Sequence, residues 1–270
     1  MINFKKITLD DKQWIEEILK SQKYMSCEYS FGNHFIWKDV YNVRIANVNG
    51  FYVAALCEEQ GISFLFPAGD CKNDALKPVI EQLLLHCKEK NYCFHMHSML
   101  DWQKIELERL FPNKFVIEES RDNFDYIYFR DVLANLDGKD FRKKRTHINK
   151  ILEKNWRYEK MTKENIPLCK EMYKKWGEDN DIKHDEGKFI EQIAVNQCFD
   201  FFEELDFFGG LLFVEENLVA FTISERINSE MVVVHIEKAF ADVDGAYPMI
   251  KQQIVTSCDQ DVVYINREDD

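Results

Sequence analysis

The run HIEKAFADVDGAYPMI (residues 235–250) joins a predicted strand to a predicted helix and carries groups that could do chemistry. His235 and Glu237 are two residues apart, so we expect them on one face of the strand. A carboxylate such as Glu237 can accept a proton from an attacking amine. A glycine-containing turn that leads into a helix presents backbone N–H groups and the positive end of the helix dipole. Gly245 therefore marks either an anion cradle or only the start of the helix.

A second candidate is a basic stretch in an acidic chain. Residues 139–160 contain nine Lys or Arg and three acidic residues, a local balance of +6, whereas the whole chain carries −13. Clustered Lys and Arg side chains neutralise phosphate or carboxylate. Three- and four-residue steps predict that five of the basic side chains share one helix face: Lys143, His147, Lys150, Lys154 and Arg157. The stretch is either an anion site or a solvated helix face.

The terminal run YINREDD offers a third candidate. Asn266, Arg267 and Glu268 follow a predicted strand, and open α/β sheets usually place ligands beyond the ends of their strands. A frayed polar terminus is the alternative. His95 and His97 would share a strand face, but no third ligand accompanies them, so we expect no metal site. The patterns GxSxG, GxGxxG, HExxH and the P-loop do not occur in the sequence.

The elements that must position these residues occur twice in the same order. In the first half, a helix at residues 11–22 precedes a hairpin turning at Asn49-Gly50, a strand at 61–66, a helix from residue 76 and a strand at 93–97. In the second half, helices at 139–155, 166–176 and 188–205 precede a hairpin turning at Glu216-Asn217, a strand at 231–240, a helix from residue 246 and a strand at 262–265. One constant shift along the chain places Leu76, Val79, Ile80 and Leu84 on Ala246, Met249, Ile250 and Ile254.

This repeated order predicts an α+β (layered α/β) protein made by duplication. We expect two domains, residues 1–133 and 134–270, each with a mixed, mostly antiparallel sheet flanked by helices. The second domain contains all three candidate sites and is the expected active-site domain.

Composition limits the remaining possibilities. Hydrophobic residues make up 46% of the 270 residues, which is enough for two cores. The first residues lack an apolar signal core, and no run approaches the ~18 apolar residues of a membrane span, so we expect a cytoplasmic protein without a transmembrane segment. Eight cysteines without a CxxC pair predict reduced thiols. The negative charge argues against bulk nucleic-acid binding, although an anionic small molecule could still contact the basic stretch.

Three motifs together resemble a known family: LANLDGKDFRKKRTHINKILEK (residues 133–154), HIEKAFADVDGAYPMIKQQI (235–254) and YINREDD (264–270). The run CEYSFGNHFIWKD (27–39) adds to the resemblance. The family is a bacterial group of uncharacterised proteins related to the C-terminal synthase domain of phosphatidylglycerol lysyltransferase, and more distantly to the Fem-type aminoacyl transferases. The resemblance implies two tandem GNAT-like acyltransferase domains. Relatives are expected to continue past YINREDD, so the second domain would be truncated at its C-terminus.

The resemblance also implies transfer of an acyl or aminoacyl group to an amine or hydroxyl acceptor. The co-substrate would be aminoacyl-tRNA, contacted at its acceptor end, or acyl-CoA, and no cofactor would be bound permanently. Ordinary GNAT enzymes hold the CoA pyrophosphate with a Gln/Arg-x-x-Gly-x-Gly/Ala loop. Aligned on Gly245, this chain has Asp242 at the basic position and Tyr247 at the small one, which disfavours conventional CoA binding. A non-catalytic binding protein with a degenerate GNAT cleft is the alternative.

For a transferase, we expect Glu237 to act as the base or as the carboxylate that positions the amine. The backbone near Gly245, with Tyr247, would hold the anionic donor. The other expected substrate contacts are Arg142, Lys144, Arg145, Asn149, Asn266, Arg267 and Glu268.

Overall fold

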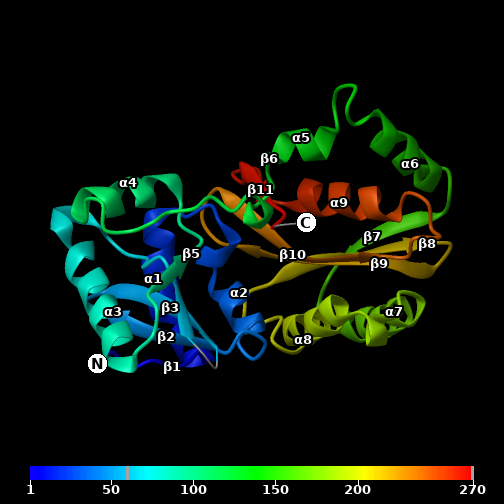
Figure 1. Cartoon of the computed structure of the whole chain (residues 1–270). Helices are drawn as coiled ribbons and strands as arrows, with labels where there is room; N and C mark the ends of the chain where they lie inside the picture. Colours follow the sequence, from blue (N-terminus) through cyan, green and yellow to red (C-terminus); the bar gives the residue numbers. More distant parts are fainter. Residues whose placement is uncertain (59–60, 269–270) are drawn as a thin grey trace. The chain divides into compact units, whose positions relative to one another are not determined.

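The computed structural model describes residues 1–58 and 61–268 and contains two compact units, Met1–Phe124 and Asp125–Glu268 (Figure 1). Within the described residues, each unit has a mixed sheet of its own, with five strands in the first and six in the second. Each sheet packs its apolar side chains against helices of the same unit.

The first unit orders its strands β1-β2-β3-β4-β5, and only the β4–β5 pair is parallel. Asn49 and Gly50 both have positive φ, as a tight hairpin turn between β2 and β3 requires. The elements are β1 (Lys5–Lys6), α1 (Lys12–Gln22), α2 (Phe31–Ile36), β2 (Val43–Val48), β3 (Phe51–Glu58), β4 (Gly61–Leu65), α3 (Leu76–Lys90), β5 (His95–His97) and α4 (Asp101–Leu110).

The second unit orders its strands β6-β11-β10-β9-β8-β7, and only the β10–β11 pair is parallel. The elements are β6 (Ile127–Phe129), α5 (Arg130–Asn135), α6 (Arg142–Leu152), β7 (Trp156–Lys160), α7 (Ile166–Asp179), α8 (Glu186–Asp200), β8 (Phe208–Val214), β9 (Asn217–Arg226), β10 (Met231–Ala239), α9 (Ala246–Ser257) and β11 (Tyr264–Asn266).

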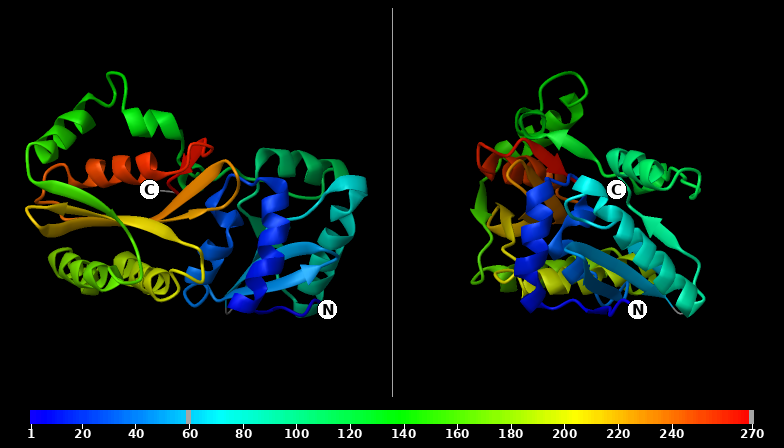
Figure 2. Two further views of the ribbon diagram at one scale, coloured as in Figure 1. Left: turned by 180° about the vertical axis from the view of Figure 1, so that it is seen from behind. Right: turned by 90° about the vertical axis from the view of Figure 1, so that its left-hand side faces the viewer.

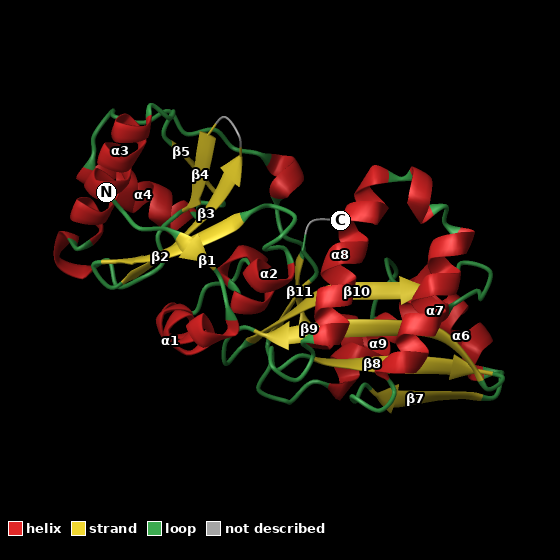
Figure 3. Cartoon of the chain, turned by 90° about the horizontal axis from the view of Figure 1, so that it is seen from below, coloured by secondary structure: helices red, strands yellow, loops and turns green. Residues whose placement is uncertain are grey.

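Helices cover both faces of the second sheet. Helix α9 lies on one face and α7 and α8 lie on the other (Figures 2 and 3). On the α7/α8 face, the Phe221 ring of β9 packs against the rings of Tyr173 and Phe199. On the other face, Met249 and Ile250 of α9 share a core with the sheet and with α6, and α5 also packs on α9. Helix α9 is therefore enclosed between the sheet and a further helical layer.

The two units contain a similar order of elements. In both units a series of antiparallel strands is followed by a helix and a parallel strand. Strands β4 and β10 begin at Gly61 and Met231, and helices α3 and α9 begin at Leu76 and Ala246. The same offset along the chain therefore relates both pairs of elements.

Several predicted boundaries are wrong. The second hairpin turns at Glu215 and Glu216, one residue earlier than expected. The predicted helix at residues 139–155 ends at Leu152, so Lys154 and Arg157 are not on it, and Arg157 belongs to β7. The sequence also predicted no strand at β6 and no helix at α5, and β6 is held in the second sheet by pairing with β11.

Two further observations concern the described residues as a whole. None of their helices combines the length and the hydropathy needed to cross a bilayer. None of the eight cysteines, all within the described residues, forms a disulfide, and five of them are buried: Cys27, Cys87, Cys169, Cys198 and Cys258.

Gly245, at the start of α9, touches the backbone of α6. A Cβ at this position would lie 2.2 Å from the carbonyl oxygen of His147, and the φ of +97° is left-handed. Gly138 provides a matched comparison, because its φ is +93° but a Cβ there would meet nothing within 4 Å.

We predict that Gly138→Ala lowers the free energy of unfolding by roughly 1–2 kcal/mol, the cost of the left-handed conformation alone. Gly245→Ala should cost more than twice as much, since α6 must also move away from α9. Urea denaturation of both variants measures the difference. Equal losses would mean that the close approach of α6 and α9 contributes nothing.

Candidate functional site

Strands β10 and β11 separate part of the way along the second sheet. Their parallel pairing ends at Val233 and Asn266, although β10 continues to Ala239. We call the opening beyond this last pair the β10–β11 fork. Glu237 on β10 and Arg267 after β11 both lie beyond the last pair, at the fork.

A β-bulge decides which side chains of β10 enter this region. The register with β9 shifts between Val234 and Ile236, so His235 is an extra residue in β10. Val234 and Glu237 consequently both face α9, where they line one cleft. His235 faces the α7/α8 side instead and contacts the Phe207 ring there. The prediction that His235 and Glu237 share a face is therefore wrong, because the bulge interrupts the alternation.

The cleft lies between α9 and the fork. Its walls are mainly apolar, and its polar groups carry one negative and three positive charges. Its free volume is about 20 Å³, room for roughly one water molecule. The lining residues are Tyr128, Leu133, Leu136, Lys144, Val234, Glu237, Pro248, Lys251, Gln252, Ile254, Val255, Ile265 and Arg267. The excess of positive charge in an apolar surrounding favours an anionic ligand.

Glu237 holds the centre of this charge cluster. Its side chain is 8% exposed, and its Oε1 lies 3.2 Å from Nζ of Lys251 and 3.6 Å from Nη2 of Arg267. One cation comes from α9 and the other from the segment after β11, so the carboxylate joins the helix to the far side of the fork. An ion-paired carboxylate at this depth orients both cations.

Among the predicted contacts from the basic stretch, only Lys144 lines the cleft. Arg145 donates to the carbonyl oxygens of Leu136 and Gly138, the latter at 2.8 Å, and so fixes the loop that follows α5. Arg142 and Asn149 are exposed and are not part of the cleft lining.

The predicted anion cradle at Gly245 is closely packed. Asp244 is hydrogen-bonded to His147 and Lys150, so two of the predicted basic face residues already have a partner within the chain. In the first turn of α9, the Ala246 N–H donates to the Val243 carbonyl at 3.0 Å. Pro248 has no N–H group. Among the first three residues of α9, the N–H of Tyr247 is therefore at most the one left to bind a ligand.

The three predicted C-terminal residues are ordered and have different partners. Asn266 is fully buried and donates to Asp125 at 2.8 Å, while its oxygen accepts the Glu268 N–H at 2.7 Å. Arg267 enters the cleft. Glu268 lies on the other face, where its Oε1 is 2.7 Å from Nδ1 of His235. The segment therefore serves both faces of the sheet.

Sequence reasoning missed Lys251, Gln252 and Tyr128 as members of the site. Lys251 and Gln252 are on α9, in the second turn of the helix, and the helical period could have placed them on the side toward Glu237. Tyr128 carried no such signal, because its place depends on the pairing of β6 with β11.

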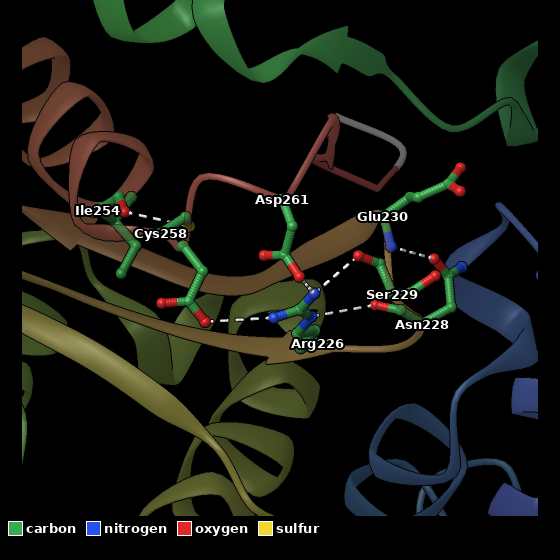
Figure 4. A network of polar contacts seen from close by, with 8 residues as sticks. Arg226, Asn228, Ser229, Glu230, Ile254, Cys258 and Asp261 are labelled. Carbon is green, nitrogen blue, oxygen red and sulfur yellow. Dashed lines mark hydrogen bonds and ion pairs between the residues drawn. The ribbon is translucent and has the colours of Figure 1, made fainter.

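A larger hollow of about 250 Å³ lies near the start of β10 and includes Lys160, Arg226 and Cys258 in its lining. Asp261 and the carbonyls of Ser229 and Asn228 accept hydrogen bonds from Arg226 (Figure 4). The distance to Asp261 is 2.7 Å, and Asp259 accepts a further bond at 3.2 Å. The donors of Arg226 are thus used to fasten a turn to the loop after α9. Burial raises the pKa of Cys258 to about 11, so its thiol is a poor nucleophile. The Glu237 cleft is the better chemical site despite its smaller volume.

Comparison with solved structures defines the class of fold. A conserved protein of unknown function from Bacteroides thetaiotaomicron is 33% identical, with a TM-score of 0.94 over 100% of this chain and 91% of that one. L-PGS from Bacillus licheniformis is 13% identical, with a TM-score of 0.63 over 93% of this chain and 76% of that one. The C-terminal domain of a putative lysylphosphatidylglycerol synthetase from Agrobacterium fabrum is 8% identical, with a TM-score of 0.62 over 96% of this chain and 78% of that one. FemX is 8% identical, with a TM-score of 0.51 over 100% of this chain and 89% of that one.

The chain therefore has the two-sheet α+β fold that these proteins share. It belongs to the family described as phosphatidylglycerol lysyltransferase, C-terminal, whose model matches residues 20–268. The family relationship predicted from the three motifs is confirmed. Comparison with curated protein sequences finds no match.

The titration of His235 gives a prediction for stability. Burial alone would lower the pKa of His235, but its hydrogen bonds to Glu225 and Glu268 and their charges outweigh burial and raise the pKa to about 9. A raised pKa in the folded state stabilises the protein fully below the unfolded value of about 6.5, and this contribution is lost as pH rises toward 9. Thermal denaturation from pH 6 to 9 should show a larger fall for the wild type than for His235→Gln. The cysteines are the same in both proteins, so their titration affects both melting temperatures equally. Melting temperatures that fall in parallel with pH would contradict the charged state of His235.

Proposed function

We propose that the chain is a transferase that moves an acyl or aminoacyl group to an amine or hydroxyl acceptor, with the Glu237 cleft as its site. The observation that carries the proposal is the placement of a buried carboxylate between Lys251 and Arg267 at the β10–β11 fork. Membership of a family named for lysyl transfer supports the same class of reaction.

The proposal includes a tandem GNAT-like organisation of two domains, expected from the sequence as residues 1–133 and 134–270, with the second as the active one. Strand β6, which precedes residue 133, pairs with β11 and is taken with the second domain. The common strand pairing of the two sheets and the constant offset between corresponding elements support it. The proposed donors, aminoacyl-tRNA and acyl-CoA, are made in the cytoplasm, where we place the protein.

In the proposed reaction, the acceptor amine or hydroxyl attacks the carbonyl carbon of the donor ester or thioester. A new C–N or C–O bond forms, the bond to the leaving oxygen or sulfur breaks, and the proton of the acceptor passes through Glu237 to the leaving group. Glu237 would orient the acceptor through a hydrogen bond and take up its proton. Lys251 and Arg267 would stabilise the negative charge that develops on the carbonyl oxygen.

Aminoacyl-tRNA is the favoured donor. Asp242 is exposed where CoA-binding loops carry a basic residue, and Asp244 already binds His147 and Lys150. The first turn of α9 has few N–H groups left for a pyrophosphate. Arg142 and Lys143 are exposed on α6 and would contact the phosphates of the acceptor end.

A non-catalytic binding protein is the second candidate, and the observation that favours it is Asp242, an exposed acid where CoA-binding loops carry a basic residue. Lysyl-tRNA, acetyl-CoA and longer acyl-CoA thioesters can be compared by thermal shift, because a ligand at 100 times its Kd stabilises by about 2.7 kcal/mol. A shift without any transferred product by mass spectrometry would support binding over catalysis.

We predict that Glu237→Gln reduces kcat/KM for transfer at least about 100-fold while the protein stays folded, since the amide cannot accept the acceptor's proton. Mass spectrometry of a panel of acceptors that includes phosphatidylglycerol and free amines measures the product. Glu159→Gln removes a half-buried, ion-paired carboxylate from β7 and serves as the matched control. Undiminished turnover by Glu237→Gln would remove Glu237 from the mechanism.

If the donor is aminoacyl-tRNA, the double variant Arg142→Gln/Lys143→Gln should raise its KM and leave kcat nearly unchanged. The dependence of KM on salt should also become shallower, by roughly 0.7 in logarithmic slope for each lost contact to a single strand. Steady-state kinetics at several salt concentrations test this. Identical slopes would place the tRNA elsewhere on the protein.

A further inference from the structure

Two ion pairs connect β10 to the segment after β11, one on each face of the second sheet. On the α9 face, Oε1 of Glu237 lies 3.6 Å from Nη2 of Arg267. On the α7/α8 face, Nδ1 of His235 lies 2.7 Å from Oε1 of Glu268. Because Arg267 and Glu268 are neighbours in the chain, the position of one side chain restricts the other.

His235 is positively charged in this arrangement. Its side chain is 1% exposed, and its second nitrogen, Nε2, lies 3.0 Å from Oε2 of Glu225 on β9. Ionised carboxylates only accept hydrogen bonds, so both ring nitrogens must donate, which requires the imidazolium. A neutral ring could serve only one of the two carboxylates. The positive charge therefore holds Glu225 and Glu268 together at one point of the sheet.

The segment that carries Arg267 leaves the sheet at this point. Beyond Asn266, β11 no longer pairs with β10, and Arg267 and Glu268 are attached on the other side through backbone hydrogen bonds to Tyr126. Glu268 has a φ of 56°, a left-handed conformation that disfavours residues with a Cβ. Among the described residues, the hydrogen bond between His235 and Glu268 is a direct side-chain link from β10 to this segment on the α7/α8 face.

We propose that His235 is a positioning residue for the cleft: its imidazolium holds Glu268 on the α7/α8 face and thereby directs Arg267 across the fork to Glu237. The function of the bulge follows from this arrangement, because without the extra residue His235 and Glu237 would share one face. The inference rests on the proposed function in taking the Glu237 cleft as the site of transfer.

The position of Arg267 can be measured without an activity assay. In ¹⁵N-labelled protein, the side-chain Nε–Hε signal of Arg267, assigned by its loss in Arg267→Lys, reports on the surroundings of the guanidinium. We expect this signal to move toward the value of a free arginine in His235→Gln and in Glu268→Gln. Glu268→Gln leaves His235 and Glu225 in place and serves if His235→Gln does not fold. The matched control is His184→Gln, since His184 forms an exposed pair with Asp181 at 2.7 Å.

A pH titration adds a readout that a merely structural role would not change. The titratable and charged groups near His235 are Glu225 on β9, Glu268 after β11, and Cys198 and the Lys238-paired Glu191 on α8. Burial raises the pKa of Cys198 well above its usual value, with a contribution from Glu268 and Glu225, so this thiol stays neutral. In the wild type, the Arg267 signal should shift between pH 8 and 10 as His235 loses its proton, whose pKa is about 9. The shift should be absent in His235→Gln.

An Arg267 signal that stays unchanged in folded Glu268→Gln or His235→Gln would overturn the proposal, as would a pH shift that persists in His235→Gln. Failure of the proposed transferase activity would leave these spectra unaffected. Conversely, if the protein catalyses transfer but its Arg267 signal does not change in His235→Gln, the transferase proposal stands and the positioning role of His235 is wrong.

Discussion

The second unit depends on the point where β10 and β11 cease to pair. Up to Val233 and Asn266 the two parallel strands share backbone hydrogen bonds, and beyond them the two chains diverge. Backbone pairing can no longer hold the sheet together there, so side chains do so: Glu237 with Arg267 on one face and His235 with Glu268 on the other. Buried charges destabilise the folded state unless they are paired. Paired charges at the β10–β11 fork are suited to bind a polar reacting group.

The apolar packing around the fork explains why its charges are fixed in place. Helix α9 lies between the sheet and the α5–α6 layer, and the close contact of Gly245 with α6 permits this arrangement. Lys251 therefore faces Glu237 from a helix whose other side is buried. Arg145, His147 and Lys150 are basic residues that the sequence suggested for ligand binding. In the structure Arg145 fixes the loop after α5, and His147 and Lys150 bind Asp244 in the loop before α9.

Elements with strong local signals could be predicted from the sequence. The Asn49-Gly50 turn and the buried faces of α3 and α9 depend on residue type and helical period, which the sequence displays directly. Strand β6 escaped prediction because its three residues form a strand only by pairing with β11, which lies much later in the chain. The bulge at His235 was equally hidden, since a regular alternation of side chains is the default for any strand. Glu237 and Arg267 could be recognised from the motifs that contain them. The pairing of Glu237 with Lys251 and the contacts of His235 with Glu225 and Glu268 depend on tertiary structure, so the sequence did not reveal them.

The central claim is that the β10–β11 fork is the place where the donor carbonyl binds. Its most direct test is a crystal structure with a stable donor analogue, a lysyl group joined by an amide to the 3′ position of adenosine. The account predicts density at the fork, with the amide oxygen within hydrogen-bonding distance of Arg267 or Lys251 and the Glu237 carboxylate beside the carbonyl carbon. Density confined to the hollow beside Arg226, with the Glu237–Arg267 pair undisturbed, would contradict it.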